Sequence, residues 1–138
     1  MILVDTALRE RETEGRPVRV GMLGAGFMGQ GLTNQIENSV PGMRVAAIYN
    51  RKPQRAVDVY AYSGHEGVRT TASQLEFDDL TERGVPVVAE DPYLMCRSPH
   101  IDSWIYDRKQ RVGTSTHNCF WLQEFVHRTS SIRTLRKA

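Results

Sequence analysis

The six residues from Gly24 to Gly29, Gly-Ala-Gly-Phe-Met-Gly, constrain the fold more than any other part of the chain. They follow a short apolar run, 18–23, which begins after Pro17 and suits a buried strand. After the second glycine, apolar residues recur at the spacing of one helical face: Met28, Leu32, Ile36 and Val40. The sequence therefore predicts a strand, a tight glycine turn and a helix in immediate succession.

This glycine spacing is weak evidence by itself, because the chain contains 11 glycines. Its place between a strand and a helix gives each glycine a physical role: Gly24 permits the turn, Gly26 lets the backbone approach a pyrophosphate, and Gly29 allows close helix packing. The helix start adds unpaired N–H groups and a positive dipole end, which attract a diphosphate. We therefore expect a Rossmann-type dinucleotide-binding loop.

The chain as far as residue 106 alternates between helix and strand patterns. A leading helix is expected in 1–16, and the apolar runs 43–49, 85–89 and 101–106 are expected to form further strands. Helices are expected at 53–63, between Ser73 and Gly84 with Ser73 and Glu76 as a capping box, and after Asp91 and Pro92. This alternation predicts an α/β fold with a doubly wound, mostly parallel sheet covered on both faces.

The residues about 20 positions beyond the last glycine of such a loop usually meet the adenosine ribose. This chain has Asn50, Arg51 and Lys52 there, and none of them is a carboxylate that would repel a 2′-phosphate. Asn50 can hydrogen-bond the ribose, and Arg51 can form charge-assisted bonds to a 2′-phosphate, with Lys52 adding positive potential. NADP is therefore favoured over NAD, with a solvated basic turn before Pro53 as the alternative interpretation.

Residues 103–138 differ in composition from the rest of the chain. Residues 1–102 carry 11 basic and 14 acidic side chains, whereas 103–138 carry 7 basic and 2 acidic ones and both tryptophans. We therefore expect an NAD(P)-binding domain, 1–106, whose sheet is incomplete at its C-terminal end, and a divergent basic tail, 107–138. The tail is either out-of-frame or disordered sequence, or it forms a final helix with an apolar face made by Phe120, Trp121, Phe125 and Val126.

Composition also argues against several classes of protein. The chain has no signal-peptide pattern and no apolar stretch long enough to span a bilayer, which favours a cytoplasmic location. Two cysteines, Cys96 and Cys119, are too few for a disulfide scaffold, and with His100 and His117 they match no zinc-site spacing, so no metal is expected. The basic tail matches no nucleic-acid-binding module. The expected partners are a dinucleotide and a small-molecule substrate, and a homo-oligomer stays open.

Three stretches of the sequence, VRVGMLGAGFMGQG, AAIYNR and VVAEDPYLMCRSPHID, resemble the homoserine dehydrogenase-like oxidoreductases that carry a C-terminal SAF domain. The resemblance covers residues 1–106 and implies an N-terminal NADP-binding Rossmann domain that precedes a substrate domain. It implies diphosphate contacts at Gly24, Gly26, Phe27, Met28 and Gly29, and adenosine-ribose contacts at Asn50 and Arg51. After Tyr106 the chain departs from the Thr-Gly turn of that family, so the resemblance assigns no catalytic residue.

Three functional hypotheses follow from these patterns. The first is the NADP(H)-binding domain of an oxidoreductase that acts on a carbonyl or alcohol substrate, with its catalytic domain absent from this chain. The second is a non-enzymatic NAD(P)-binding regulatory module, since binding needs only the first βαβ units. The third is the product of a truncated gene, without a function of its own.

Overall fold

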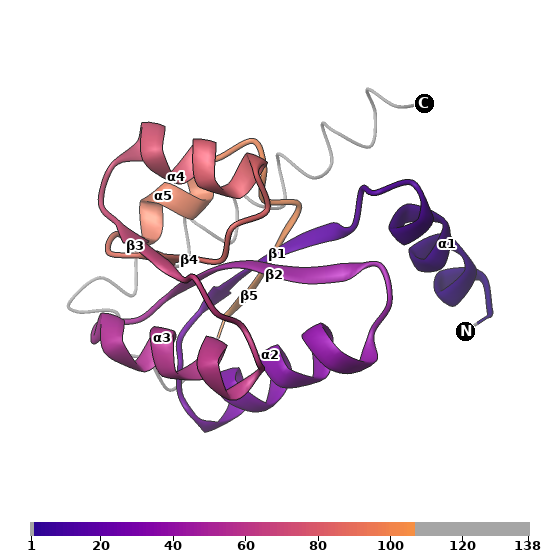
Figure 1. Cartoon of the computed structure of the whole chain (residues 1–138), viewed down its shortest axis with the longest axis horizontal. Helices are drawn as coiled ribbons and strands as arrows, with labels where there is room; N and C mark the ends of the chain where they lie inside the picture. The colour runs from indigo at the N-terminus through magenta and orange to yellow at the C-terminus, as the bar shows by residue number, and fades with distance from the viewer. Residues whose placement is uncertain (1, 107–138) are drawn as a thin grey trace.

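Alternating helix and strand patterns produce the predicted α/β architecture (Figure 1). The computed structural model describes residues 2–106, so the hypotheses about the tail lie outside the described residues. The helices are α1 (Ile2–Thr13), α2 (Phe27–Ser39), α3 (Pro53–Tyr62), α4 (Gln74–Glu82) and α5 (Pro92–Arg97). The strands are β1 (Val18–Leu23), β2 (Met43–Tyr49), β3 (Arg69–Thr71), β4 (Val87–Ala89) and β5 (Ser103–Tyr106). Among these helices, none has the length and apolar character needed to cross a membrane.

The five strands form one parallel sheet in the order β3-β4-β2-β1-β5. The chain moves from β1 to β2 and on to β3 and β4, and then returns to place β5 on the other side of β1. Leu23 at the end of β1 is in register with Tyr49 of β2 and with Tyr106 of β5. The strand order therefore reverses beside the carboxyl end of β1, the place where open α/β sheets bind ligands.

Helices cover both faces of the sheet, which makes the fold doubly wound as predicted. Successive residues of a strand point to opposite faces, so Met22, Ile48 and Val88 pack with α2 and α3, while Leu23, Ala47 and Val87 pack with α4 and α5. Figure 1 shows these two pairs of helices on opposite sides of the sheet, with α1 apart from both at the end of the molecule. The central strands β1, β2 and β4 carry buried apolar residues on both sides because helices cover both of their faces.

The buried face of α2 differs from the predicted one. Of the four apolar residues expected on it, only Ile36 is buried, whereas Met28 and Leu32 are exposed and Val40 is the C-cap residue. The residues that face the sheet are Gly29, Thr33 and Ile36. Gly29 must lie against the turn that follows β1 (see below), and this contact sets the rotation of the helix.

Strand β3 was missed by the sequence pattern. Its three residues are polar and two of them are exposed, so they carry no apolar alternation. Backbone pairing makes this strand instead: β3 runs parallel to β4, and the Arg69 N–H donates to the Pro86 carbonyl at 3.0 Å. The strand predicted at 85–89 is shorter in the structure, and the one predicted at 101–106 begins at Ser103.

The two predicted helix starts have different outcomes. Asp91 caps α5 as expected, because its carboxylate accepts the Tyr93 N–H at 2.9 Å with Pro92 in the first turn. The capping box at Ser73 and Glu76 is wrong: Ser73 is the N-cap residue of α4, but its side chain forms no capping bond. Glu76 instead accepts a hydrogen bond from the Thr71 hydroxyl at 2.7 Å, which ties the end of β3 to α4.

Candidate functional site

The glycine loop, residues 24–26, leaves the carboxyl end of β1 and enters α2 directly. Gly24 has a φ of 120°, which residues other than glycine rarely adopt. Its N–H donates to the Tyr49 carbonyl at 2.8 Å, and the next N–H, from Ala25, donates to Oδ1 of Asn50 at 3.3 Å. The loop is therefore held against the end of β2 by two consecutive backbone donors.

The third glycine of the motif is required by close packing. A Cβ atom at Gly29 would lie 2.6 Å from the Gly24 carbonyl oxygen, well inside van der Waals contact with the backbone. Gly31, one position past Gln30 in the same helix, has nothing within 4 Å of such a Cβ. The first turn of α2 thus packs on the loop through a glycine, as the sequence pattern predicts for this position.

The amino end of α2 has the features of an anion-binding helix terminus. Gly26 is the N-cap residue, with an extended backbone (φ −82°, ψ −168°), and no side chain caps the helix. The first helical bond runs from the Gln30 N–H to the Gly26 carbonyl, so the preceding N–H groups have no partner within the helix. Phe27, 91% exposed, and Met28 lie at the same end. This terminus can bind a phosphate through its N–H groups and dipole.

Asn50 lies immediately after β2, and its side chain is directed into the protein. It is only 2% exposed, and its Nδ2 donates to the Lys52 carbonyl at 2.9 Å while Oδ1 accepts from Ala25. The predicted hydrogen bond from this amide to a ribose would therefore compete with bonds already made inside the chain.

Basic side chains surround the start of α3, which follows Asn50. Arg51, Lys52 and Arg55 are all exposed, and the ion pairs within residues 2–106 include none of the three. The first turn of α3 also carries no acidic residue. Cations at a helix amino end are unfavourable because they repel the dipole. We refer to Arg51, Lys52 and Arg55 as the basic turn. Sequence reasoning missed Arg55. Its position four residues after Arg51 is the feature that could have identified it.

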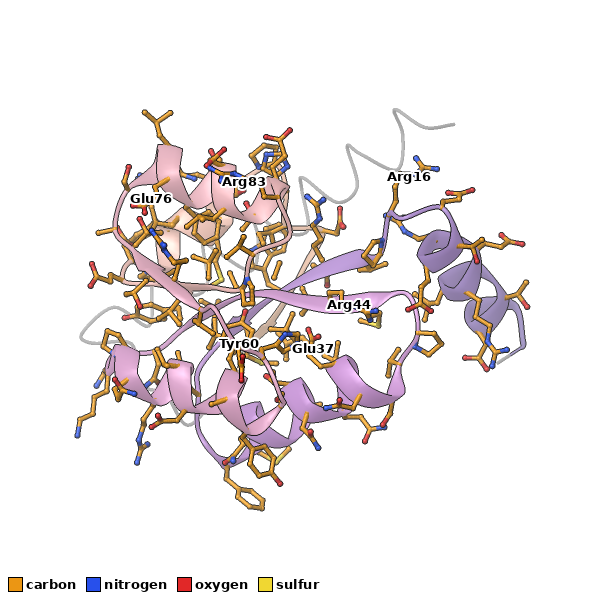
Figure 2. All side chains as sticks on the ribbon, viewed as in Figure 1. Arg16, Glu37, Arg44, Tyr60, Glu76 and Arg83 are labelled. Carbon is orange, nitrogen blue, oxygen red and sulfur yellow. The ribbon has the colours of Figure 1, made fainter. Side chains whose placement is uncertain are left out.

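A second polar cluster joins α2, β2 and α3 away from the glycine loop (Figure 2). The Glu37 carboxylate, whose side chain is 4% exposed, accepts the Val45 N–H at 2.5 Å and lies 2.6 Å from Nε2 of His65. Tyr60 donates its hydroxyl to the Val45 carbonyl at 2.9 Å. Burial, reinforced by the negative charge of Glu37, raises the pKa of Tyr60 well above its ordinary 10.0.

Perturbed titratable groups often mark active sites, but this cluster has a structural role. Tyr60 is fully buried, and its hydroxyl is bonded to the backbone of β2, so no substrate can reach it. Across residues 2–106, no group of three or more His, Cys, Asp or Glu side chains is placed to hold a metal ion. The glycine loop and the basic turn therefore form the candidate site.

Comparison with known proteins adds no assignment. No protein family matches this sequence, and no curated protein matches it significantly. Functional inference therefore depends on the fold and on the geometry of this site.

Proposed function

We propose that this chain binds NADP(H) at the glycine loop and the basic turn, as the cofactor-binding domain of an oxidoreductase acting on a carbonyl or alcohol substrate. One observation carries the proposal: the amino end of α2, without a side-chain cap, lies at the carboxyl end of β1 beside the reversal of strand order. This is the position at which doubly wound folds bind a pyrophosphate. The resemblance of residues 1–106 to homoserine dehydrogenase-like oxidoreductases supports it.

The residues present fit both charged parts of NADP(H). The N–H groups of α2 suit the diphosphate, because an anion satisfies donors that the helix leaves unpaired. The basic turn suits a 2′-phosphate, because Arg51 can bind two phosphate oxygens at once and an anion would relieve the repulsion at the start of α3. The preference for NADP(H) over NAD(H) is therefore assigned to Arg51, with Lys52 and Arg55 adding positive potential.

The bound nicotinamide would supply hydride transfer, and the residues of this chain bind and orient the cofactor. We assign no catalytic residue among residues 2–106, because Tyr60, whose pKa is raised well above its ordinary value, is enclosed in the core. Oxidation of bound NADPH in the presence of carbonyl compounds would support the oxidoreductase assignment. Binding without any such turnover would favour the regulatory module instead.

The test is a titration of the full chain with NADPH and NADH, followed by cofactor fluorescence. We expect NADPH to bind more tightly, and Arg51→Ala to weaken NADPH by about tenfold or more, the magnitude of one lost charged hydrogen bond. NADH affinity should stay within about twofold, because NADH has no 2′-phosphate for Arg51 to bind. Arg83→Ala is the control, since Arg83 is an exposed arginine at the C-cap of α4, the helix that covers the opposite face of the sheet (Figure 2).

Gly26→Glu tests the diphosphate end of the site. The backbone dihedral angles of Gly26 are open to any residue, so the substitution adds no backbone strain, and a melting temperature close to that of the wild type checks that the variant is folded. A carboxylate at the amino end of α2 should nevertheless abolish binding of both nucleotides by repelling the diphosphate. If a folded wild-type chain binds neither nucleotide, the proposed function is wrong.

A further inference from the structure

The strongest remaining feature of the site is that one buried side chain contacts both of its halves. Oδ1 of Asn50 accepts from the glycine loop at Ala25, and Nδ2 donates to the carbonyl of Lys52 in the basic turn. The two partners lie on opposite sides of Asn50 in the sequence, 25 residues before it and two residues after it.

We propose that Asn50 is a positioning residue that couples the glycine loop to the basic turn, so that the diphosphate and 2′-phosphate ends of the site are held in one geometry. The proposal rests on the proposed function for the identity of the ligand. It differs from the ribose contact expected from the sequence, because the amide acts through the backbone of its neighbours. Recognition of the adenosine end then belongs to the exposed basic side chains.

The chemistry of the two bonds requires an amide. An amide can accept from one backbone group and donate to another, whereas a carboxylate can only accept. Asp at position 50 would keep an acceptor for the Ala25 N–H but would direct a negative oxygen toward the Lys52 carbonyl. Because Asn50 is buried, water would not replace the hydrogen bond that the backbone group of Ala25 or of Lys52 lost.

The glycine loop also gains a defined donor pattern from this contact. Asn50 and the Tyr49 carbonyl engage the N–H groups of Ala25 and Gly24, which removes both from the donors that face a ligand. The donors left for the diphosphate are those at the start of α2, which point along the helix axis. Loss of the Asn50 amide would therefore let the loop turn away from this arrangement.

The first experiment needs no nucleotide and measures amide hydrogen exchange at Ala25 in the free full-length chain. Asn50→Ala removes the side-chain oxygen that accepts this N–H, and we expect exchange to be about tenfold faster, as for the loss of one hydrogen bond. Asn38→Ala is the matched control, because its amide also donates to a backbone carbonyl, that of Ser63, but away from the loop. It should leave Ala25 exchange within about twofold. Unchanged exchange in Asn50→Ala would overturn the coupling.

The second experiment is a double-mutant cycle on NADPH and NADH affinity. If Asn50 positions the basic turn, Arg51→Ala should lower the NADPH-over-NADH preference at least about threefold less in the Asn50→Ala background than in the wild type. If Asn50 instead contacted the ribose independently of the basic turn, Arg51→Ala would have the same effect in both backgrounds, and that result would overturn the proposal. Asn50→Asp, close in size to the native residue, serves as the second variant should Asn50→Ala fail to fold, and it should lower the same preference.

The two proposals fail in different ways. If the wild type binds neither nucleotide, the proposed function is wrong, while exchange at Ala25 still decides whether Asn50 holds the loop. If NADPH binds and the cycle is additive, cofactor binding stands and the positioning role of Asn50 is rejected.

Discussion

Two glycines of α2 illustrate how the surroundings of a residue decide what it contributes. Gly29 lies against the Gly24 carbonyl, whereas Gly31 faces open space, although both are helical and only two positions apart. A glycine costs helix stability because it loses more backbone entropy than alanine on folding. Gly31 has that cost with no visible compensation, while Gly29 permits the contact on which the loop depends.

Opposite stability changes are expected when each glycine is replaced by alanine. Gly29→Ala should lower the free energy of unfolding by about 1–3 kcal/mol, because its Cβ would overlap the backbone of Gly24. Gly31→Ala should raise it by about 0.5–1 kcal/mol through helix propensity. Urea denaturation of the two variants measures both changes. Equal effects of the same sign would contradict the packing described here.

Helix α3 is attached to the sheet by polar groups as well as by its apolar face. Tyr60 bonds the carbonyl of Val45 in β2, and Glu37 of α2 bonds the N–H of the same residue. Val45 is therefore held by a side chain from each neighbouring helix. His65, just beyond α3, contacts the other oxygen of Glu37 and lies edge-on to the Tyr60 ring. These contacts connect both helices on one face to the same point of the central strand.

The buried Tyr60 should make the protein sensitive to alkali. Its pKa is raised in the folded protein, so above pH about 10 the unfolded chain loses this proton while the folded chain retains it. The free energy of unfolding should therefore fall by up to about 1.4 kcal/mol per pH unit above that value. Urea titrations between pH about 8 and 11 measure the slope, which should be shallower in Tyr60→Phe.

Tyr62 provides the control for this measurement. It is 62% exposed on the same helix, so Tyr62→Phe should keep the alkaline slope of the wild type. At neutral pH, Tyr60→Phe should cost about 1 kcal/mol through the lost bond to Val45. A wild-type slope in Tyr60→Phe would mean that another group controls the alkaline transition.

The whole sheet is organised around β2, which lies between β1 and β4 and has a packed core on each face. The edge strand β3 has three residues, of which two are exposed, and it pairs with β4 alone. Stability should therefore fall from the centre of the sheet toward this edge, because edge backbone groups open to solvent without unfolding the core.

Hydrogen exchange across the chain measures this gradient. The amides of Ala47 and Ile48 in β2 should exchange only by global unfolding, with protection close to the full free energy of unfolding. The hydrogen-bonded amides of β3 should exchange at least about tenfold faster through local opening. Equal protection in both strands would show that β3 unfolds together with the core.

Local patterns were sufficient for the order of the helices, for four of the five strands and for the glycine loop. The bounds of β1 and β2 and the start of α2 follow from short apolar runs, Pro17 and the three glycines, because those features restrict the backbone directly. The roles of Gly24 as a turn and Gly29 as a packing contact follow from the same motif. Arg51 and Lys52 of the basic turn are equally visible in the sequence.

Tertiary structure alone decided the features that depend on groups distant in the sequence. The rotation of α2 is set by the approach of Gly29 to the loop. The spacing of the apolar residues contains no information about this contact. Strand β3 exists through pairing with β4, and Glu76 bonds Thr71 in place of the expected cap, since each needs a partner from another segment. The direction of the Asn50 amide likewise depends on Ala25, because a polar side chain at the end of a strand can face solvent or the interior, and only the packed neighbours decide between them.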